Sequence, residues 1–208
     1  MKVTIIYDNT AFSKNLTPDW GFSCLVEAYG RKILFDTGAK GSILLDNMKK
    51  LGIDTSEVTD IFISHGHWDH TGGLFDFLRI NQVKVYIPES YKTSGDIFVR
   101  VNDELEICEN IYSTGELDNI EHSLVVKEEN NVTVITGCSH PGVEKILEKA
   151  SQFGEVRTLI GGLHGFKNFL VAKDLNIICP AHCTQHIQKI KELYPDKYVE
   201  AGAGRVIK

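Results

Sequence analysis

The stretch Ser64-His65-Gly66-His67-Trp68-Asp69-His70-Thr71-Gly72-Gly73 decides how this sequence is interpreted. It follows an apolar run and holds three of the eight histidines of the chain, together with one carboxylate, within six residues. Imidazole and carboxylate groups together bind zinc, iron, manganese or nickel, and a tight loop after a buried strand holds such ligands rigidly. The stretch therefore predicts a metal site at the end of a strand.

The spacing of the ligands suggests how this loop is used. His65 and His67 stand two residues apart and can reach one ion, while Asp69 and His70 turn toward a second. The alternative interpretation is a solvated polar turn with locally hydrogen-bonded histidines. So dense a set of ligand types favours the metal site over that alternative.

Three later β-rich segments also end in loops that carry a histidine. The pairs are residues 132–136 with His140, residues 156–160 with His164, and residues 177–179 with His182. Loops at the carboxyl ends of strands tend to converge on one crevice in sheets of this kind. We therefore expect these histidines to meet the first loop.

The rest of the chain reads as alternating strands and helices. Predicted strands are residues 2–7, 22–28, 32–35, 59–64, 83–87 and 123–127, and predicted helices are residues 43–51, 71–79, one opened by Pro141, and 184–193. Residues 88–119 are polar and are interpreted as irregular, with Tyr91, Phe98 and Tyr112 packing in the core or lining a pocket. Residues 201–205 predict a turn before a short final strand.

Composition sets the outer limits. The chain has 208 residues, 42% hydrophobic and 24% charged, which predicts a single domain over residues 1–208. The net charge of −6, without a basic run, argues against a nucleic-acid partner.

No apolar stretch approaches the ~20 residues of a membrane span, and Asp8 interrupts the N-terminal region before a signal peptide could form. Five scattered cysteines without a C-x-x-C pair predict reduced thiols. We expect a cytoplasmic protein with a small-molecule substrate and no membrane partner; the oligomeric state is not indicated.

The histidine loop resembles the signature of the metallo-β-lactamase superfamily. Residues 33–38, which end in Asp36-Thr37-Gly38, resemble an early strand of that superfamily, and Pro180-Ala181-His182 resembles its late histidine loop. Thr136-Gly137-Cys138-Ser139-His140-Pro141-Gly142 and Gly161-Gly162-Leu163-His164 resemble the branch of dihydropterin ribofuranosylaminobenzene 5′-phosphate synthase-like proteins.

The resemblance implies an α/β fold, a four-layer αββα sandwich with a metal site, usually dinuclear, at one edge. It implies that His65, His67 and a third histidine bind one ion and that Asp69, His70 and His182 bind the other. Asp36 would orient a ligand histidine through its second ring nitrogen. Zinc, as two ions, is the expected cofactor, with iron, manganese or nickel as alternatives.

One position departs from the superfamily pattern. Many members have an aspartate that bridges the two metals where this chain has Cys138. We expect His140 to act as the third histidine, with Cys138 or His122 as alternatives, and we expect the second ion to bind more weakly. A cysteine ligand would favour zinc over manganese.

The predicted function is a metal-dependent hydrolase that uses a metal-activated hydroxide on a phosphoester, lactone or thioester. Asp69 would orient the hydroxide, and His164 would contact the substrate or protonate the leaving group. The alternative is a metal-dependent transferase or synthase that acts on a pterin-like phosphorylated compound. A diiron oxygen reductase ranks lowest, because such members usually carry a carboxylate at the position of His67. His186, on a polar helix face, is expected to have no role in the site.

Overall fold

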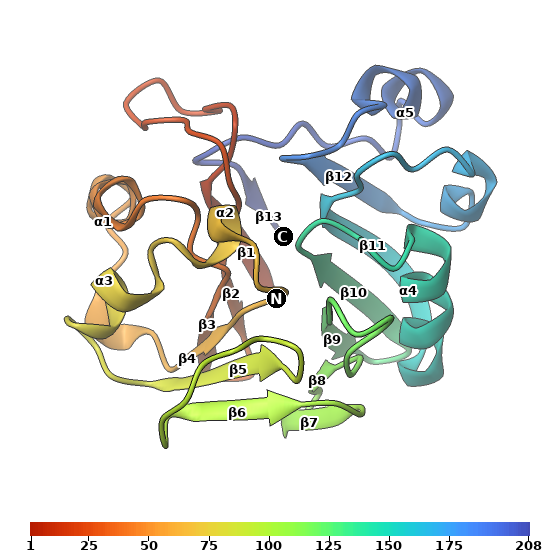
Figure 1. Ribbon diagram of the computed structural model, residues 1–208. Helices are drawn as coiled ribbons and strands as arrows, with labels where there is room; N and C mark the ends of the chain where they lie inside the picture. The colour runs from red at the N-terminus through yellow and green to blue at the C-terminus, as the bar shows by residue number, and fades with distance from the viewer.

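The computed structural model describes residues 1–208 and consists of two β-sheets packed face to face, with helices on both outer sides (Figure 1). The first sheet contains β1 (Lys2–Tyr7), β2 (Ser23–Ala28), β3 (Arg31–Phe35), β4 (Asp60–Phe62), β5 (Lys84–Pro88), β6 (Phe98–Val101) and β13 (Val206–Ile207), in the order β13-β1-β2-β3-β4-β5-β6. The second contains β7 (Leu105–Cys108), β8 (Ile111–Ser113), β9 (Leu124–Glu128), β10 (Asn131–Thr136), β11 (Glu155–Gly162) and β12 (Ile177–Ala181), in the order β12-β11-β10-β9-β8-β7. The predicted αββα sandwich is confirmed.

The helices lie on the outer faces of the sheets. They are α1 (Gly41–Lys50), α2 (Trp68–Thr71), α3 (Leu74–Leu78), α4 (Val143–Ala150) and α5 (Ile187–Leu193), with short 3-10 turns at Thr55–Glu57, Ser151–Phe153 and Phe169–Ala172. Helices α1 and α3 cover the first sheet, and α4 and α5 cover the second (Figure 1). None of the helices has the length and apolar character that crossing a membrane requires.

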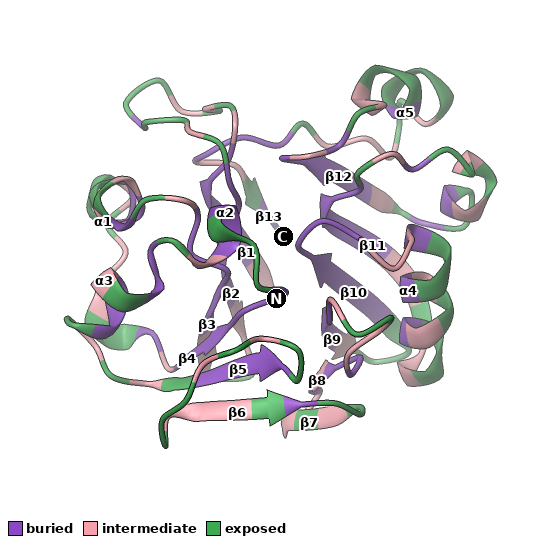
Figure 2. Ribbon diagram, in the orientation of Figure 1, coloured by how far each residue is buried: buried purple, intermediate pink, exposed green.

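Three apolar layers hold the sandwich together. The middle layer combines both sheets, with Phe35 and Phe62 from the first and Ile135 and Ile160 from the second, all fully buried. The outer layers pack α1 and α3 on the first sheet and α4 and α5 on the second. Figure 2 shows the pattern as buried strands between helices with exposed outer faces. Burial of this extent is the main favourable contribution to the stability of the fold.

Strand direction decides where the functional loops lie. Strands β3, β4 and β5 are parallel to one another, and so are β10, β11 and β12. Their carboxyl ends open into the loops that carry Asp36, the histidine stretch, His140, His164 and His182. The loop that bears α2 lies centrally in the view of Figure 1, opposite the ends of β10 and β11.

Several predicted elements need correction. The less regular segment predicted over residues 88–119 contains three short strands that were not predicted, β6, β7 and β8, and turns and loops form the rest of it. The predicted helix over residues 71–79 is divided into α2 and α3 at Gly72 and Gly73, where an added Cβ would come within 2.0 Å and 2.5 Å of backbone oxygens of the neighbouring segment. Helices α4 and α5 begin two and three residues later than predicted, because turns follow the histidine-bearing loops after β10 and β12. The aromatic residues Tyr91, Phe98 and Tyr112 pack against the outer apolar layers.

Candidate metal centre

The loop after β4 divides its side chains between the interior and solvent. His65 and His70 are completely buried and Asp69 is 8% exposed, whereas His67 and Trp68 are exposed. The short helix α2 produces this division, because its first turn directs Asp69 and His70 inward and Trp68 outward. Three of the predicted ligands of the loop therefore lie in the interior, and His67 lies on its exposed side.

The first group of ligands joins this loop to the loop after β10. His65, His67 and His140 place one nitrogen each within 4.8 Å of one another. His65 Nε2 lies 3.1 Å from His67 Nδ1, and the ring of His140 lies 4.7 Å from that of His65 and 4.8 Å from that of His67. His140 Nε2 is buried without a hydrogen-bond partner. The structure thus brings together the three histidines predicted for one ion.

The second group joins the same loop to the loop after β12. Asp69, His70 and His182 also place one ligand atom each within 4.8 Å of one another. Asp69 Oδ2 lies 3.2 Å from His182 Nε2, an atom that is buried without a hydrogen-bond partner. Asp69 Oδ2 also accepts a hydrogen bond of 2.8 Å from Trp20 Nε1. These are the residues predicted for the other ion.

The spacing of these atoms fits metal ligation. Two ligands at about 2.0–2.2 Å from one tetrahedral ion are about 3.3–3.6 Å apart. The pairs His65–His67 and Asp69–His182, at 3.1 Å and 3.2 Å, come close to this value, and the inner nitrogens have no other partner that holds them there. The donor set of nitrogen and oxygen atoms suits zinc and other first-row metals.

Asp36 fixes the ring of His70 from outside. This fully buried carboxylate binds His70 Nδ1 at 2.7 Å and accepts hydrogen bonds from Ser64 N and Ser64 Oγ, each at 2.7 Å. The contact assigns the proton of His70 to Nδ1 and leaves Nε2 free to face the site. Asp36 thus occupies the orienting position that the resemblance implies.

Two N-terminal residues fix His182 in the same way, and sequence reasoning missed them. Asn9 Oδ1 lies 2.9 Å from His182 Nδ1, and Asn9 Nδ2 donates to the His182 carbonyl at 2.9 Å. Asp8 Oδ1 accepts a hydrogen bond from His182 N at 2.9 Å, and burial raises the pKa of Asp8 to about 6. No local motif marks these residues, because they lie more than 170 positions from their partner.

Glu121 organises the loop after β10 and was also missed. Its fully buried carboxylate accepts five hydrogen bonds of 2.9–3.1 Å, from Thr136 Oγ1 and from the backbone nitrogens of residues 137, 138, 139 and 140. Four successive amide groups directed at one carboxylate form a compact anion nest. Glu121 thereby fixes the backbone that presents Cys138 and His140.

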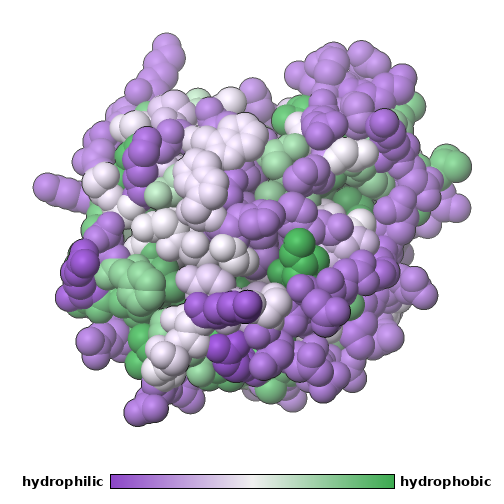
Figure 3. All heavy atoms as spheres, in the orientation of Figure 1, coloured by the Kyte–Doolittle hydropathy of each residue, from purple (hydrophilic) through white to green (hydrophobic).

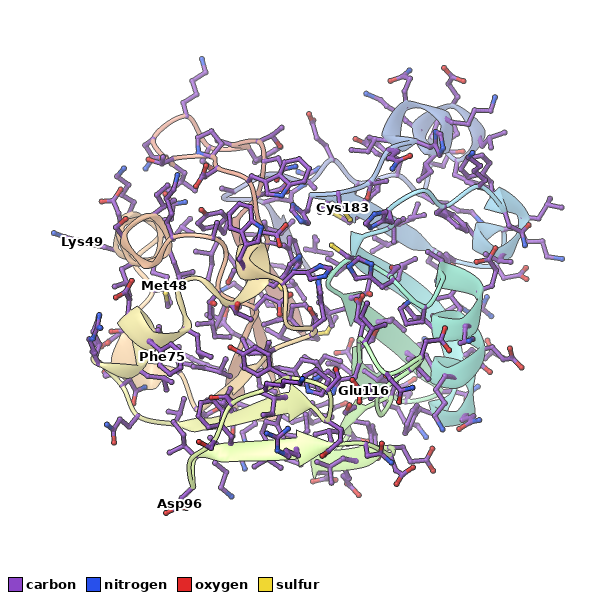
Figure 4. All side chains as sticks on the ribbon, viewed as in Figure 1. Met48, Lys49, Phe75, Asp96, Glu116 and Cys183 are labelled. Atoms are coloured by element: carbon purple, nitrogen blue, oxygen red, sulfur yellow. The ribbon has the colours of Figure 1, made fainter.

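The cysteines separate into site and core residues. Cys138 Sγ lies 3.2 Å from His70 Nε2, and Cys183, labelled in Figure 4, places its Sγ 3.8 Å from the Cys138 carbonyl oxygen. The neighbouring Cys183 and burial together raise the pKa of the Cys138 thiol, so a thiolate there needs the positive charge of a cation. Cys179 packs in the apolar layer between the sheets and takes no part in the site.

The remaining histidines have different surroundings. His164 is exposed, with its ring 4.9 Å from that of His140, beside a cavity of about 460 Å³ whose lining includes Lys167 and Asn168. His122 is buried outside the site, where its nitrogens contact Ser113 Oγ at 2.9 Å and the Ile63 carbonyl at 2.8 Å. His186 packs beside Phe169, away from both ligand groups.

Backbone strain accompanies these positions. Asp36, Ser139, His164 and His182 have φ values of 51°, 58°, 44° and 48°, in the left-handed region that is uncommon for residues other than glycine. Such conformations concentrate at functional sites, where the surrounding structure enforces them. All four stand in loops at the carboxyl ends of parallel strands.

The electrostatics favour a neutral, ligand-ready imidazole at His65. Burial, with the charges of the neighbouring histidines, lowers its pKa well below the ordinary value. Ser64 Oγ lies 2.9 Å from its Nδ1, which leaves Nε2 for the site. Burial alone would raise the pKa of Asp69, but the side chain of His182 and the charge of His70 hold it below its usual value, so the carboxylate is ionised.

Comparisons with known proteins agree with this geometry. Residues 17–96 match the family model of the metallo-β-lactamase superfamily. A 7,8-dihydropterin-6-methyl-4-(beta-D-ribofuranosyl)-aminobenzene-5'-phosphate synthase of Methanocaldococcus jannaschii is 25% identical over 279 aligned positions, which cover 99% of this chain and 95% of that protein. An uncharacterised protein of the same organism is 27% identical and covered to 99%.

Solved structures support the fold. The crystal structure of a metal-dependent hydrolase of the β-lactamase superfamily has a TM-score of 0.79 at 23% identity, covering 100% of this chain and 98% of the other. Zinc-bound PqqB from Methylobacterium extorquens has a TM-score of 0.65 at 12% identity, covering 100% of both chains. The chain thus resembles the metallo-β-lactamase superfamily in its histidine loop, which lies within the matching segment, and shares the fold of these solved structures in its two facing sheets.

Proposed function

We propose that the protein is a metal-dependent hydrolase of a small substrate such as a phosphoester, lactone or thioester. The observation that carries this proposal is the pair of three-ligand groups side by side at the edge of the sandwich, with the cavity at His164 next to them. We propose two bound ions, preferably zinc. Such first-row ions would lower the pKa of a bound water and polarise a carbonyl or phosphoryl oxygen of the substrate.

The residues of the chain would divide the remaining work. The ionised carboxylate of Asp69, held by Trp20 Nε1, can accept a hydrogen bond from the attacking water and orient it. His164 stands at the rim of the cavity beside His140, from where its imidazole can donate a proton to the leaving group. Lys167, in the same lining, suits a negatively charged substrate group.

A second function has one specific observation in its favour. The curated relative with 25% identity is a synthase of a phosphorylated pterin compound, and the similarity extends over nearly the full length of both proteins. We therefore keep a metal-dependent synthase acting on a pterin-like phosphorylated compound as the alternative. The cytoplasmic location stays a prediction.

The test combines metal analysis with a substrate panel. The protein reconstituted with zinc, manganese or iron is assayed against phosphoesters, lactones, thioesters and pterin phosphates. His164→Asn is the informative variant, because asparagine tolerates the left-handed backbone of that position. We expect a fall in kcat of about 10²–10⁴-fold with unchanged metal content.

His186→Asn serves as the matched control and should keep full activity. A reconstituted protein that is inert toward every hydrolytic substrate but converts a pterin phosphate would replace the hydrolase proposal with the synthase. A His164→Asn variant with normal kcat would remove the proton-donor role from His164.

A further inference from the structure

The loop after β10 supplies two potential ligands, His140 and Cys138, whose ligand atoms lie within 4.8 Å of each other and which belong to different groups with the histidine stretch. His140 joins His65 and His67, as described above. Cys138 Sγ instead groups with His65 and His70, all within 4.8 Å of one another, and lies 3.2 Å from His70 Nε2. Because His65 belongs to the first ligand group and His70 to the second, the sulfur of Cys138 lies between the two.

A second observation points to a ligand at the same place. His182 is only 7% exposed, and its Nε2 is buried without a hydrogen-bond partner. A ring nitrogen of His182 also groups with Cys138 Sγ and Cys183 Sγ, all within 4.8 Å of one another. A buried ring nitrogen between the Asp69 carboxylate, 3.2 Å away, and a nearby thiol with which it forms no hydrogen bond is best satisfied by a cation that all three bind.

The buried carboxylates around the site are already committed to other contacts. Glu121 accepts five hydrogen bonds from the loop, and Asp36 holds His70 and Ser64. Asp8 accepts from His182 N, and Asp69 belongs to the second ligand group. No carboxylate among them is left to connect the two groups, which leaves the thiol of Cys138 for that place.

We propose that Cys138 bridges the two ions as a thiolate, so that His140 and Cys138 hold different positions instead of competing for one. The inference rests on the metal site of the proposed function. Binding releases the thiol proton to solvent, and the sulfur lone pairs form one bond to each ion. A soft bridging ligand favours zinc or ferrous iron over manganese.

Cobalt(II) provides a readout that needs no substrate. The purified protein is stripped of metal and titrated with Co²⁺ while its absorption spectrum is recorded. We expect a sulfur-to-cobalt charge-transfer band in the near ultraviolet for the unmodified protein and its loss in Cys138→Ser. Cys183→Ser is the matched control, because Cys183 is the neighbouring thiol of the same site, and it should keep the band.

Two further measurements separate a bridge from a single-ion ligand. The affinity for the second equivalent of Co²⁺ should fall at least about tenfold in Cys138→Ser, a loss that substitutions around metal sites commonly cause. Cys138→Asp, which offers a carboxylate in place of the thiolate, should bind two equivalents without the band. Circular dichroism verifies that each variant is folded.

The outcomes distinguish this inference from the proposed function. A band that persists in Cys138→Ser, or one that only Cys183→Ser removes, overturns the bridge, as does cobalt binding without any such band. A protein that binds no cobalt at all overturns the bridge and the proposed metal-dependent function together.

Discussion

At the scale of single residues, the hydrogen bonds of the ring nitrogens distinguish three of the proposed ligand histidines from His122. His65, His70 and His182 each have one nitrogen held by a neighbouring side chain, and the other directed at the site. His122 has partners on both nitrogens, so it has no lone pair left for a metal. The alternative of His122 as third histidine is therefore disfavoured, whereas His140 lies at the required place.

Removal of a ligand imidazole should reduce bound metal without unfolding the protein. We expect His67→Ala and His182→Ala each to abolish activity and lower metal content, because each deletes one of a small set of ligands. Elemental analysis and circular dichroism check the two effects separately. His186→Ala is the control; equal damage from that variant, or intact metal content in His67→Ala, would refute the assignment.

His122 predicts a pH dependence of stability. Burial lowers its pKa to about 3, far below the value of about 6.5 in an unfolded chain. The unfolded state therefore binds more protons between these values, and the free energy of unfolding must fall as the pH decreases from about 6.5 toward 3.

The variant His122→Gln isolates this contribution, since an amide can still donate to the Ile63 carbonyl but does not titrate. Urea unfolding at several pH values should show a stability difference between the unmodified protein and the variant that shrinks below pH 6.5 by up to about 1.4 kcal/mol per pH unit. A difference that is constant down to pH 4 would contradict the buried, neutral state of His122.

At the scale of elements, Glu121 makes the loop after β10 a rigid unit. Its replacement by glutamine removes the charge and turns one acceptor into a donor that faces His140 N. We expect Glu121→Gln to lower the free energy of unfolding by about 2–4 kcal/mol and to weaken metal binding, since buried charged hydrogen bonds are lost.

Urea unfolding and metal titration measure these two effects. Glu148→Gln, an exposed glutamate on the neighbouring α4, is the control and should change neither. Metal affinity that stays unchanged in Glu121→Gln would mean that the loop needs no carboxylate to hold its ligands.

Sequence reasoning predicted the elements whose patterns are local. Apolar runs followed by loops with a histidine predict β4, β10, β11 and β12. The spacing of the histidines and Asp69 in the first of these loops predicts the candidate metal site at the carboxyl ends of these strands. The short strands β6, β7 and β8 were missed, because β6 and β7 lie at sheet edges and expose residues that read as loop.

The supporting residues of the site were missed for a different reason. Asn9 acts on a residue 173 positions away, and Glu121 on a loop 15–19 positions away, so neither belongs to a motif. A single buried carboxylate or amide has no periodic signal in the sequence. Only the folded chain shows which backbone amides it meets.

At the scale of the whole molecule, the site connects the two sheets. His65, His67, Asp69 and His70 come from the first sheet, whereas His140 and His182 come from loops of the second. The surrounding face is mainly hydrophilic, with paler, weakly polar residues at its centre (Figure 3). Bound ions would therefore fasten the two halves of the sandwich together along its edge.

Chelation should consequently lower the thermal stability. At a free metal concentration of 100 times Kd, binding contributes about 2.7 kcal/mol, which corresponds to a decrease in Tm of about 5–10 °C when the metal is removed. Calorimetry with and without EDTA measures the change, and His182→Ala should respond less. Equal Tm values for loaded and chelated protein would show that the ions do not connect the sheets.

The contacts between His182 and residues 8 and 9 close loops of more than 170 residues, and β1 pairs with β13 at the other end of the chain. Such distant closures are entropically expensive and come late in folding. We therefore expect the site to be incomplete in the transition state for folding, so that a bound ion would slow unfolding without changing the folding rate. Stopped-flow measurements should find that chelation speeds unfolding and leaves the refolding rate nearly unchanged.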